Sequence, residues 1–301
     1  MQPFYCVERS GFKHLVNVLD LKYQIPLRKH FSKYEIPKLY NEVIGIVKPE
    51  VQRARYFAAS TDLWSSKANH PYLSFTVHFI SKSWDLNSYC LDTVPIFEDH
   101  TGQNLADAIQ DILASWELKP EDLVGTTTDN GSNFIAAFNL LDWPRISCFG
   151  HNLDLAINKA LKIHRIDRAI ARCHSLVEVF SRSWKKNRDL HQKQTELGLK
   201  QHKRIADVAT RWGSTYKMIA RLIEQHQAIC AVLVEDRKNW YRMPSDSEFS
   251  TLEAVASVLG PLSVFTDALS GEKCVTVSAI QPFLRYIVDD LHRMIVPWSR
   301  K

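Results

Sequence analysis

The sequence predicts an α/β protein, in which a mixed sheet with flanking helices is preceded by N-terminal helices and followed by an all-α region. Three observations support this prediction. The apolar spacing changes from a helical to a strand-like period near residue 56. Strand, turn and helix patterns then alternate as far as residue 163, which is typical of a mixed or parallel sheet covered by helices. Beyond that point every pattern is helical. We therefore divide the 301-residue chain into regions 1–52, 53–163 and 164–301.

The first region predicts helices. Between residues 4 and 51 apolar residues recur at helical spacing, as in the stripe of Leu15, Val18 and Leu19. Two prolines, Pro26 and Pro37, interrupt the pattern.

The middle region predicts five strands. Runs rich in β-forming residues at 56–63 and 72–80 are separated by Ser, Lys, Asn, His and Pro, so we expect two neighbouring strands. Three more strand patterns each lead into a helix: 89–97 before a helix at 105–116, 123–128 before a helix from 134, and 145–149 before a helix at 151–161.

The composition indicates a globular protein without a membrane span. The chain is 45% hydrophobic and 24% charged, which suffices for one full core and a second, smaller unit. Its net charge of +5 gives a mild positive field that favours a polyanion without identifying one. Six scattered cysteines without a C-x2-C pair indicate a reducing compartment. Because neither a long apolar run nor a signal-peptide pattern occurs, we expect a soluble intracellular protein.

One aspartate lies near the end of a β-rich run and another follows such a run. Asp62 lies in FAASTDLW and Asp129 in LVGTTTDNGSN, so each would project from the carboxyl end of a core strand, where sites form in open α/β sheets. Two carboxylates held there can share a divalent cation such as Mg²⁺ or Mn²⁺. The alternative is that both are turn residues, since DNG is a common turn sequence and Asp after Thr caps helices well. Spacing alone favours this alternative.

Longer blocks of sequence change that balance. The chain contains STDLWSS followed by YLSFTVHFI, then TTDNGSNF, CFGHNLDLAINKAL and DVATRWGSTYKMIARL, in this order. With these blocks it resembles the hAT transposase family, especially transposase-derived proteins that also carry BED-type zinc fingers. The resemblance implies an RNase H-like domain interrupted by a helical insertion, with an Asp, Asp, Glu set that binds Mg²⁺ or Mn²⁺ and cuts DNA. It makes Asp62 the first acid and Asp129 the second.

Cys148 and His151 form a C-x2-H block that the resemblance places beside the active site. A cysteine and a histidine can ligate zinc, but a tetrahedral site needs two more ligands, and the sequence offers no evident partner pair. We therefore predict no zinc site. The other interpretation is that Cys148 is a buried strand residue and His151 opens the next helix.

Two further segments are candidates for DNA contact. Arg211 and Trp212 match the family's RW block, whose tryptophan the resemblance implies stacks on an unpaired base; the alternative is that Trp212 fills the core. The most basic stretch contains Lys185, Lys186 and Arg188, which could track phosphates. A solvated helix surface is the favoured alternative for this stretch.

The sequence departs from the family at three points. We recognise no third acid, no C-terminal dimerisation segment and no BED finger, and we expect the chain to end inside the helical insertion. Our leading hypothesis is a DNA-associated nuclear protein with an incomplete catalytic set and no transposase activity of its own, with a homo-oligomer left open. The alternatives are an active Mg²⁺- or Mn²⁺-dependent transposase or nuclease, and a protein-interaction scaffold.

Overall fold

The computed structural model describes the chain in segments, namely residues 3–202, 212–234, 236, 238–271 and 277–295, with the side chains of 278–289 only in the last of these. The chain forms two compact units, Met1–Ile146 and Ser147–Lys301. Each unit has its own apolar core.

The first unit contains a five-stranded mixed sheet in the order β3-β2-β1-β4-β5. The strands are β1 (Phe57–Ser65), β2 (Pro71–Ile80), β3 (Leu86–Pro95), β4 (Leu123–Thr128) and β5 (Arg145–Ser147). β1 and β2 pair antiparallel, as do β2 and β3, whereas β1 and β4 pair parallel. The predicted α/β class with a mixed sheet is therefore confirmed.

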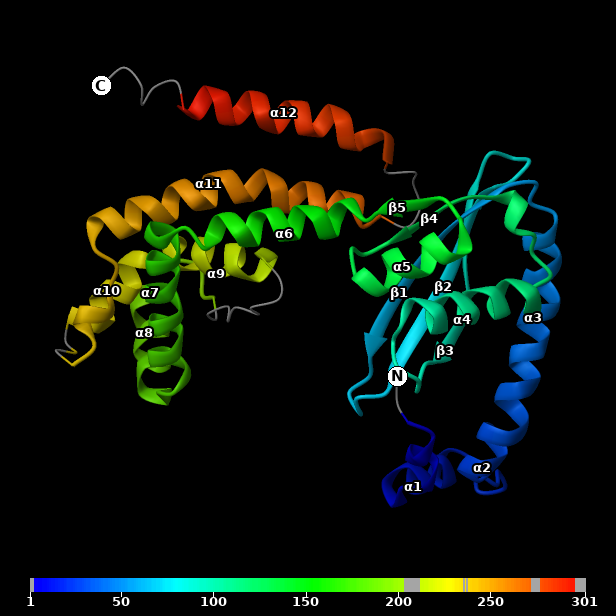
Figure 1. The fold of residues 1–301 in the computed structure, drawn as a ribbon. Coiled ribbons are helices and arrows are strands. Elements are labelled where there is room, and N and C mark those ends of the chain that lie inside the picture. The colour runs from blue at the N-terminus through cyan, green and yellow to red at the C-terminus, as the bar shows by residue number, and fades with distance from the viewer. Residues whose placement is uncertain (1–2, 203–211, 235, 237, 272–276, 296–301) are drawn as a thin grey trace. The chain divides into compact units, whose positions relative to one another are not determined.

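Helices cover one face of this sheet (Figure 1). They are α3 (Ile36–Gln52), α4 (Gly102–Ser115) and α5 (Ser132–Leu141), and side chains from all three join one core with inward-facing residues of the strands. A 3-10 turn, η3 (Pro120–Asp122), leads into β4. Thr101 caps α4 by accepting a hydrogen bond from the N–H of Asn104, which satisfies one of the N–H groups that a helix start leaves unpaired.

The two faces of the sheet differ in chemistry because side chains alternate along each strand. On β2, Leu73, Phe75 and Val77 are buried under the helices, whereas the residues between them are only half-buried. We call the side opposite α3, α4 and α5 the outer face. It carries Ser60, Asp62 and Trp64 of β1 and Tyr72, Ser74, Thr76 and His78 of β2.

The N-terminal segments before α3 are helical, as predicted. They are η1 (Phe4–Glu8), α1 (Ser10–Leu19), α2 (Arg28–His30) and the π-helical η2 (Phe31–Glu35), and none of their residues is buried. Pro37 lies in the first turn of α3, where a missing N–H costs no helical hydrogen bond.

The second unit is helical in its described part. Its elements are α6 (Phe149–Leu161), α7 (His164–Ser181), α8 (Trp184–Glu196), α9 (Trp212–Glu224), α10 (His226–Val234), η4 (Trp240–Arg242), α11 (Asp246–Leu269) and α12 (Val277–Ile295). The sequence analysis placed α6 with the strands, in region 53–163. The structure instead packs Ile157 of α6 into the core of the helical unit, so the division falls between Ile146 and Ser147.

Helix α11 is long and apolar enough, by length and composition, to cross a membrane. Leu252 and Leu259 on this helix are buried in the core of the helical unit, where α11 packs against α7 and α9. One side of α11 therefore lies in this core, whereas 28% of its apolar window is buried.

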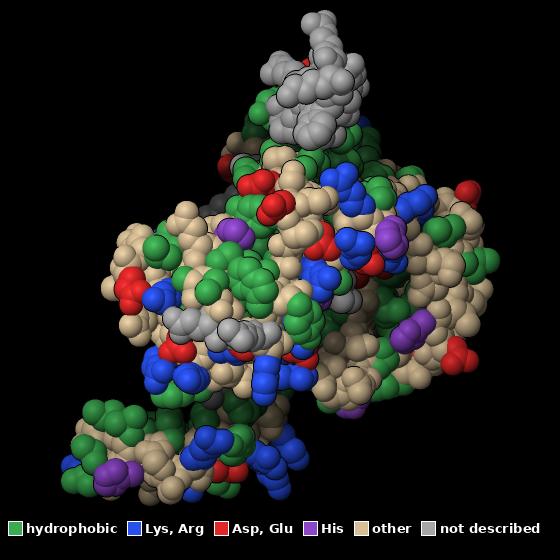
Figure 2. Space-filling model, turned by 90° about the vertical axis from the view of Figure 1, so that its left-hand side faces the viewer, with side chains coloured by type: hydrophobic (Ala, Val, Ile, Leu, Met, Phe, Trp, Pro, Cys, Tyr) green, Lys and Arg blue, Asp and Glu red, His purple; other side chains and the backbone are tan. Residues whose placement is uncertain are grey.

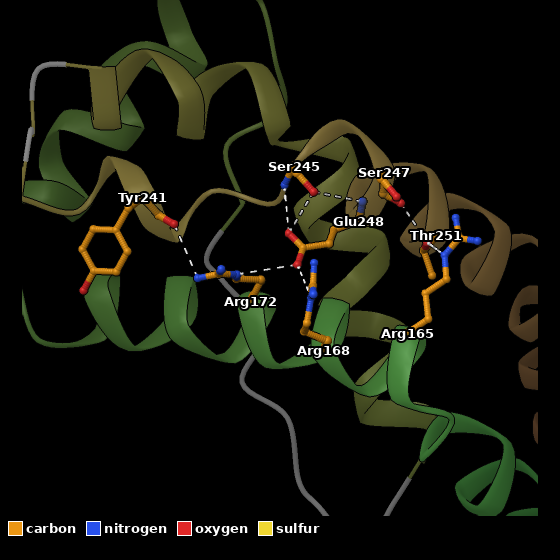
Figure 3. Close-up of polar contacts among 8 residues, drawn as sticks. All are labelled: Arg165, Arg168, Arg172, Tyr241, Ser245, Ser247, Glu248 and Thr251. Carbon is orange, nitrogen blue, oxygen red and sulfur yellow. Dashed lines mark hydrogen bonds and ion pairs between the residues drawn. The ribbon is translucent and has the colours of Figure 1, made fainter.

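A polar network joins α7 to the start of α11 (Figure 3). Ser245 caps α11 by accepting from the N–H of Glu248, and the Glu248 carboxylate accepts in return from the N–H of Ser245 at 3.0 Å. Arg168 Nε donates to the same carboxylate at 3.0 Å, with Arg172 Nε 3.8 Å away. The Glu248 side chain is only 8% exposed. The pKa of Glu248 is lowered, mainly by the hydrogen bond from the Ser245 N–H and further by the one from Arg168. Burial of the carboxyl group acts in the opposite direction.

The buried threonines of β4 generate the first prediction. Thr126 Oγ1 has no hydrogen-bond partner among the described residues, whereas Thr128 Oγ1 donates to the carbonyl of Asp129 at 2.7 Å. Thr126→Val removes an unsatisfied hydroxyl and is expected to raise the free energy of unfolding by about 1 kcal/mol, whereas Thr128→Val is expected to lower it by about 1–2 kcal/mol. Urea denaturation monitored by circular dichroism gives the free energies of unfolding of the two variants. Equal destabilisation by both substitutions would contradict the assignment.

The capping box generates the second prediction. Glu248→Ala is expected to lower the free energy of unfolding by about 1–2 kcal/mol at neutral pH, because the cap and the Arg168 contact are lost together. Glu253→Ala, at an exposed position on the same helix, is the matched control and is expected to have little effect. Because the folded pKa of Glu248 lies below its ordinary value of 4.5, its contribution is full above that value and disappears as the pH falls through the folded pKa. Denaturation curves of the wild type and Glu248→Ala should therefore converge in acid.

Candidate functional site

The parallel pairing of β1 with β4 brings the two aspartates to one level. Ser60 faces Thr127 in the register, and Asp62 and Asp129 each lie two residues further along. Neighbouring strands are about 4.8 Å apart, so the two residues are close in space. Even spacing places Asp62 and Thr127 on the outer face, and Asp129 directly follows the last residue of β4.

The sequence predicts Asp62 at the carboxyl end of a strand, but the structure places it inside β1. The β1–β2 hairpin continues to Ser65, and Asp62 pairs with Ser74 of β2. β4 ends earlier, at Thr128, directly before Asp129. The pair of aspartates thus marks the level at which β4 leaves the sheet.

Each carboxylate is oriented by a backbone N–H. The N–H of Leu63 donates to Asp62 Oδ1 at 3.0 Å, and the N–H of Gly131 donates to Asp129 Oδ1 at 2.9 Å. The hydrogen bond from Gly131 to Asp129 forms an Asx turn. Asp129 is therefore a turn residue, as the DNG pattern indicates, and it can also be a metal ligand. Asp129 does not cap α5, because Gly131 occupies the N-cap position.

Gly131 and Arg145 position Asp129, and sequence reasoning missed both. A Cβ on Gly131 would lie 2.5 Å from Asn133 Oδ1 and 3.1 Å from Asp129 Oδ1, so a side chain there would displace the ends of these two side chains. Arg145 Nη1 donates to the carbonyl of Asp129 and to Thr128 Oγ1, both at 3.2 Å. The glycine in DNG was a readable signal for a tight turn. The Arg145 contact depends on β5 lying beside β4, which no local pattern reveals.

No group of three or more Asp, Glu, His or Cys side chains that could hold a metal occurs among the residues that the structure describes. Of the glutamates beyond Trp212, Glu224 and Glu248 form ion pairs within the helical unit, and Glu253 is exposed on α11. Glu235 and Glu272 lie outside the described residues. Among the described residues the candidate site therefore has two carboxylates, those of Asp62 and Asp129.

Cys148 and His151 lie at the start of α6, in the helical unit. Cys148 follows β5 and occupies the N-cap position of α6 with an extended backbone, and its side chain is half-buried. His151 is the third residue of α6 and is also half-buried. Their predicted place beside the catalytic acids stays a prediction.

Trp212 begins α9 and is 5% exposed, within the core of the helical unit. This is the position that the core-filling interpretation expects. Stacking on a base would require the indole to leave this core, so the predicted DNA contact of Trp212 stays a prediction. Arg211 lies outside the described residues.

The basic stretch forms α8, where acidic side chains bind several of its charges. Lys186 forms an ion pair with Asp236 that lowers the pKa of this carboxyl, and Arg188 binds Asp189 at 2.8 Å. Lys185 is exposed and forms no ion pair with the described residues. On the face drawn in Figure 2, Lys and Arg side chains lie among Asp and Glu side chains. The predicted phosphate contacts of Lys185, Lys186 and Arg188 stay a prediction, and paired cations are less available for this role.

The chain matches two consecutive family models. The ZBED1 RNase-like domain covers residues 60–147, and the ZBED1 RNase-like helical domain covers residues 146–258. Their junction coincides with the division between the two structural units. Asp62 and Asp129 fall in the first domain, and Cys148, His151 and Trp212 fall in the second.

Known relatives extend this similarity. The chain is 25% identical to human zinc finger BED domain-containing protein 4 over 95% of its own length and 25% of that protein. It is 25% identical to the putative AC transposase of Zea mays, over 92% of this chain and 36% of that protein. The chain is 21% identical to the putative transcriptional regulator tpeD of Talaromyces stipitatus, over 97% of this chain and 39% of that protein. The chain thus spans between a quarter and two fifths of the length of these relatives.

The five-stranded mixed sheet with its covering helices has the architecture that an RNase-like domain requires, and the all-α unit has that of the helical domain. The order of the two units along the chain is also the order of the two family models. The chain therefore belongs to the transposase-derived proteins of the BED and hAT transposase family, and its first unit has an RNase H-like fold.

Proposed function

We propose that this chain is a DNA-associated nuclear protein in which Asp62 and Asp129 hold a divalent cation. The observation that supports the proposal is the register of β1 and β4, which pairs Ser60 with Thr127, two residues before Asp62 and Asp129 respectively. The names of relatives, which include a transposase and a transcriptional regulator, support association with DNA and a nuclear location.

The two side chains fit a hard cation. Carboxylate oxygens are preferred ligands of Mg²⁺ and Mn²⁺, and the N–H groups of Leu63 and Gly131 already fix one oxygen of each. When bound, such a cation would stabilise negative charge on a phosphodiester. The protein's own contribution is to orient the carboxylates before any cation arrives, which reduces the ordering that binding requires.

We further propose that two carboxylates give weak cation binding and no efficient strand transfer by this chain alone. Cation sites are sensitive to the number of charged ligands. Glu248, which could have been a third acid by its place in the sequence, is bound by Ser245 and Arg168 in the helical unit. The proposed role is therefore DNA association, with a cation site that retains part of a catalytic set.

The third prediction tests this site. Asp62→Asn and Asp129→Asn are each expected to weaken Mn²⁺ binding about 10-fold or more, because each removes a charged ligand. Asp111→Asn, at an exposed position of α4, is the matched control and should leave binding unchanged. Isothermal titration with Mn²⁺ gives the affinities, and a nicking assay on duplex DNA gives the activity.

Two results would count against the proposal. If Mn²⁺ binds equally well to the wild type and to both aspartate variants, the cation does not occupy this site. If the wild type nicks DNA in Mn²⁺ and both variants do not, the proposed lack of activity is wrong.

The fourth prediction concerns Gly131. Gly131→Ala is expected to weaken Mn²⁺ binding several-fold, because a Cβ 3.1 Å from Asp129 Oδ1 and 2.5 Å from Asn133 Oδ1 displaces the Asp129 carboxylate from its present orientation. Gly45→Ala is a suitable control, because a Cβ there meets no atom within 4 Å and alanine favours the helix. Unchanged Mn²⁺ affinity in a folded Gly131→Ala protein would show that the turn does not control the site.

A further inference from the structure

Two aromatic side chains lie on the outer face beside Asp62. Trp64 is two residues beyond Asp62 on β1, and Tyr72 is its cross-strand partner on β2. Their rings are stacked, with centroids 5.1 Å apart and an interplanar angle of 23°. The Trp64 side chain is nevertheless 44% exposed. A large apolar ring is thus held in a fixed orientation with much of its surface uncovered.

Pro95 of β3 pairs with Tyr72, and the neighbouring outer-face residues of β1 and β2 are polar. Ser74 lies opposite Asp62, and Ser60, Thr76 and His78 follow along the two strands. Against this background the two rings form an isolated aromatic surface. Each ring has two flat faces, and stacking covers one face of Trp64 and one face of Tyr72. Neither ring has another aromatic contact with the described residues.

A stabilising role in the hairpin accounts for part of this arrangement. Cross-strand aromatic pairs stabilise antiparallel strands, and Trp64 and Tyr72 are directly opposite. Stability of the hairpin, however, does not require the indole to remain nearly half exposed. Nor does it require the pair to lie next to the two aspartates.

The spacing to the carboxylates is what a nucleic-acid site needs. Residues two apart on a strand are separated by about 7 Å on the same face, so the indole lies one side-chain position beyond Asp62. Single-stranded nucleic acids bind sheet surfaces by stacking unpaired bases on exposed aromatic rings. A phosphate near Asp62 and Asp129 would bring the base of a neighbouring nucleotide into the region of Trp64.

We propose that Trp64, held in place by Tyr72, is a stacking platform for an unpaired base of single-stranded DNA. The proposal rests on the proposed function, because it takes the neighbouring phosphate to lie at the two aspartates. Tyr72 fixes the plane of the indole, which reduces the ordering that the base must bring about on binding. The preferred ligand is a single strand, because bases paired within a duplex do not offer their flat faces.

Another exposed tryptophan provides the matched control. Trp84 is 87% exposed, follows the end of β2 that is remote from Tyr72, and has no aromatic contact with the described residues. It belongs to the same unit and is at least as accessible as Trp64. It lacks both the stacked partner and the neighbouring aspartates.

The experiment compares two strands of equal length, a fluorescein-labelled thymidine homopolymer and an abasic strand with the same phosphates. Fluorescence anisotropy with the full chain in the presence of Mn²⁺ gives the affinity for each. The wild type is expected to prefer the thymidine strand. Trp64→Leu, which keeps an apolar side chain but removes the ring, is expected to reduce this preference about 10-fold. Trp64→Phe should retain most of it, and Trp84→Leu should retain all of it.

The outcomes separate the platform from the proposed function. If a folded Trp64→Leu protein prefers the thymidine strand over the abasic strand as strongly as the wild type does, the proposal that Trp64 stacks on a base is wrong. The proposed association with DNA is then unaffected. If the folded wild type binds neither strand and no duplex, both fail. Crosslinking of the wild type to a strand containing 5-iododeoxyuridine decides the matter if Trp64→Leu does not fold. An adduct on Trp64 or Tyr72 is expected, and adducts confined to other residues would overturn the platform.

Discussion

The parallel pairing of β1 with β4 is the constraint on which the RNase H-like unit depends. β1 lies in the middle of the sheet, between the antiparallel β2 and the parallel β4. A parallel neighbour requires a crossover, which the chain makes through β3 and α4 before it returns as β4. The register is then decisive, because a slip by one residue would move Thr127 to the core side and change the position of Asp129 relative to Asp62.

The outer face is also organised by hydrogen bonds that cross three strands. His78 of β2 is bonded through Nε2 to Ser60 of β1 at 3.0 Å and through Nδ1 to Ser88 of β3 at 2.8 Å. Partial burial lowers the pKa of His78 and therefore favours a neutral ring, which has one donor and one acceptor nitrogen. Two hydroxyl groups suit this ring because each can donate or accept. One side of the sheet is thus stabilised by apolar packing and the other by a polar ladder.

Local patterns in the sequence revealed the elements but not their partners. The β-rich runs and the turns between them predicted the strands and the position of Asp129 directly after one of them, but they placed Asp62 too close to a strand end. The division of the units could not be read in this way, because the apolar stripe of α6 fits a sheet or a helical core equally well until Ile157 has a neighbour. The Trp64–Tyr72 stack depends on the register of a hairpin. The burial of Trp212 depends on helices far away in the sequence.

The network around Glu248 sets an order of events during folding. The capping box joins residues three apart, whereas the contacts of Arg165 with Thr251 and of Arg168 with Glu248 join residues 86 and 80 apart. Local contacts form early, and distant ones must first overcome the entropy of closing a long loop. On a ribosome, α7 emerges long before the residues that it binds. The helical unit therefore cannot complete its core until α11 has been synthesised, whereas the capping box can form within α11 alone.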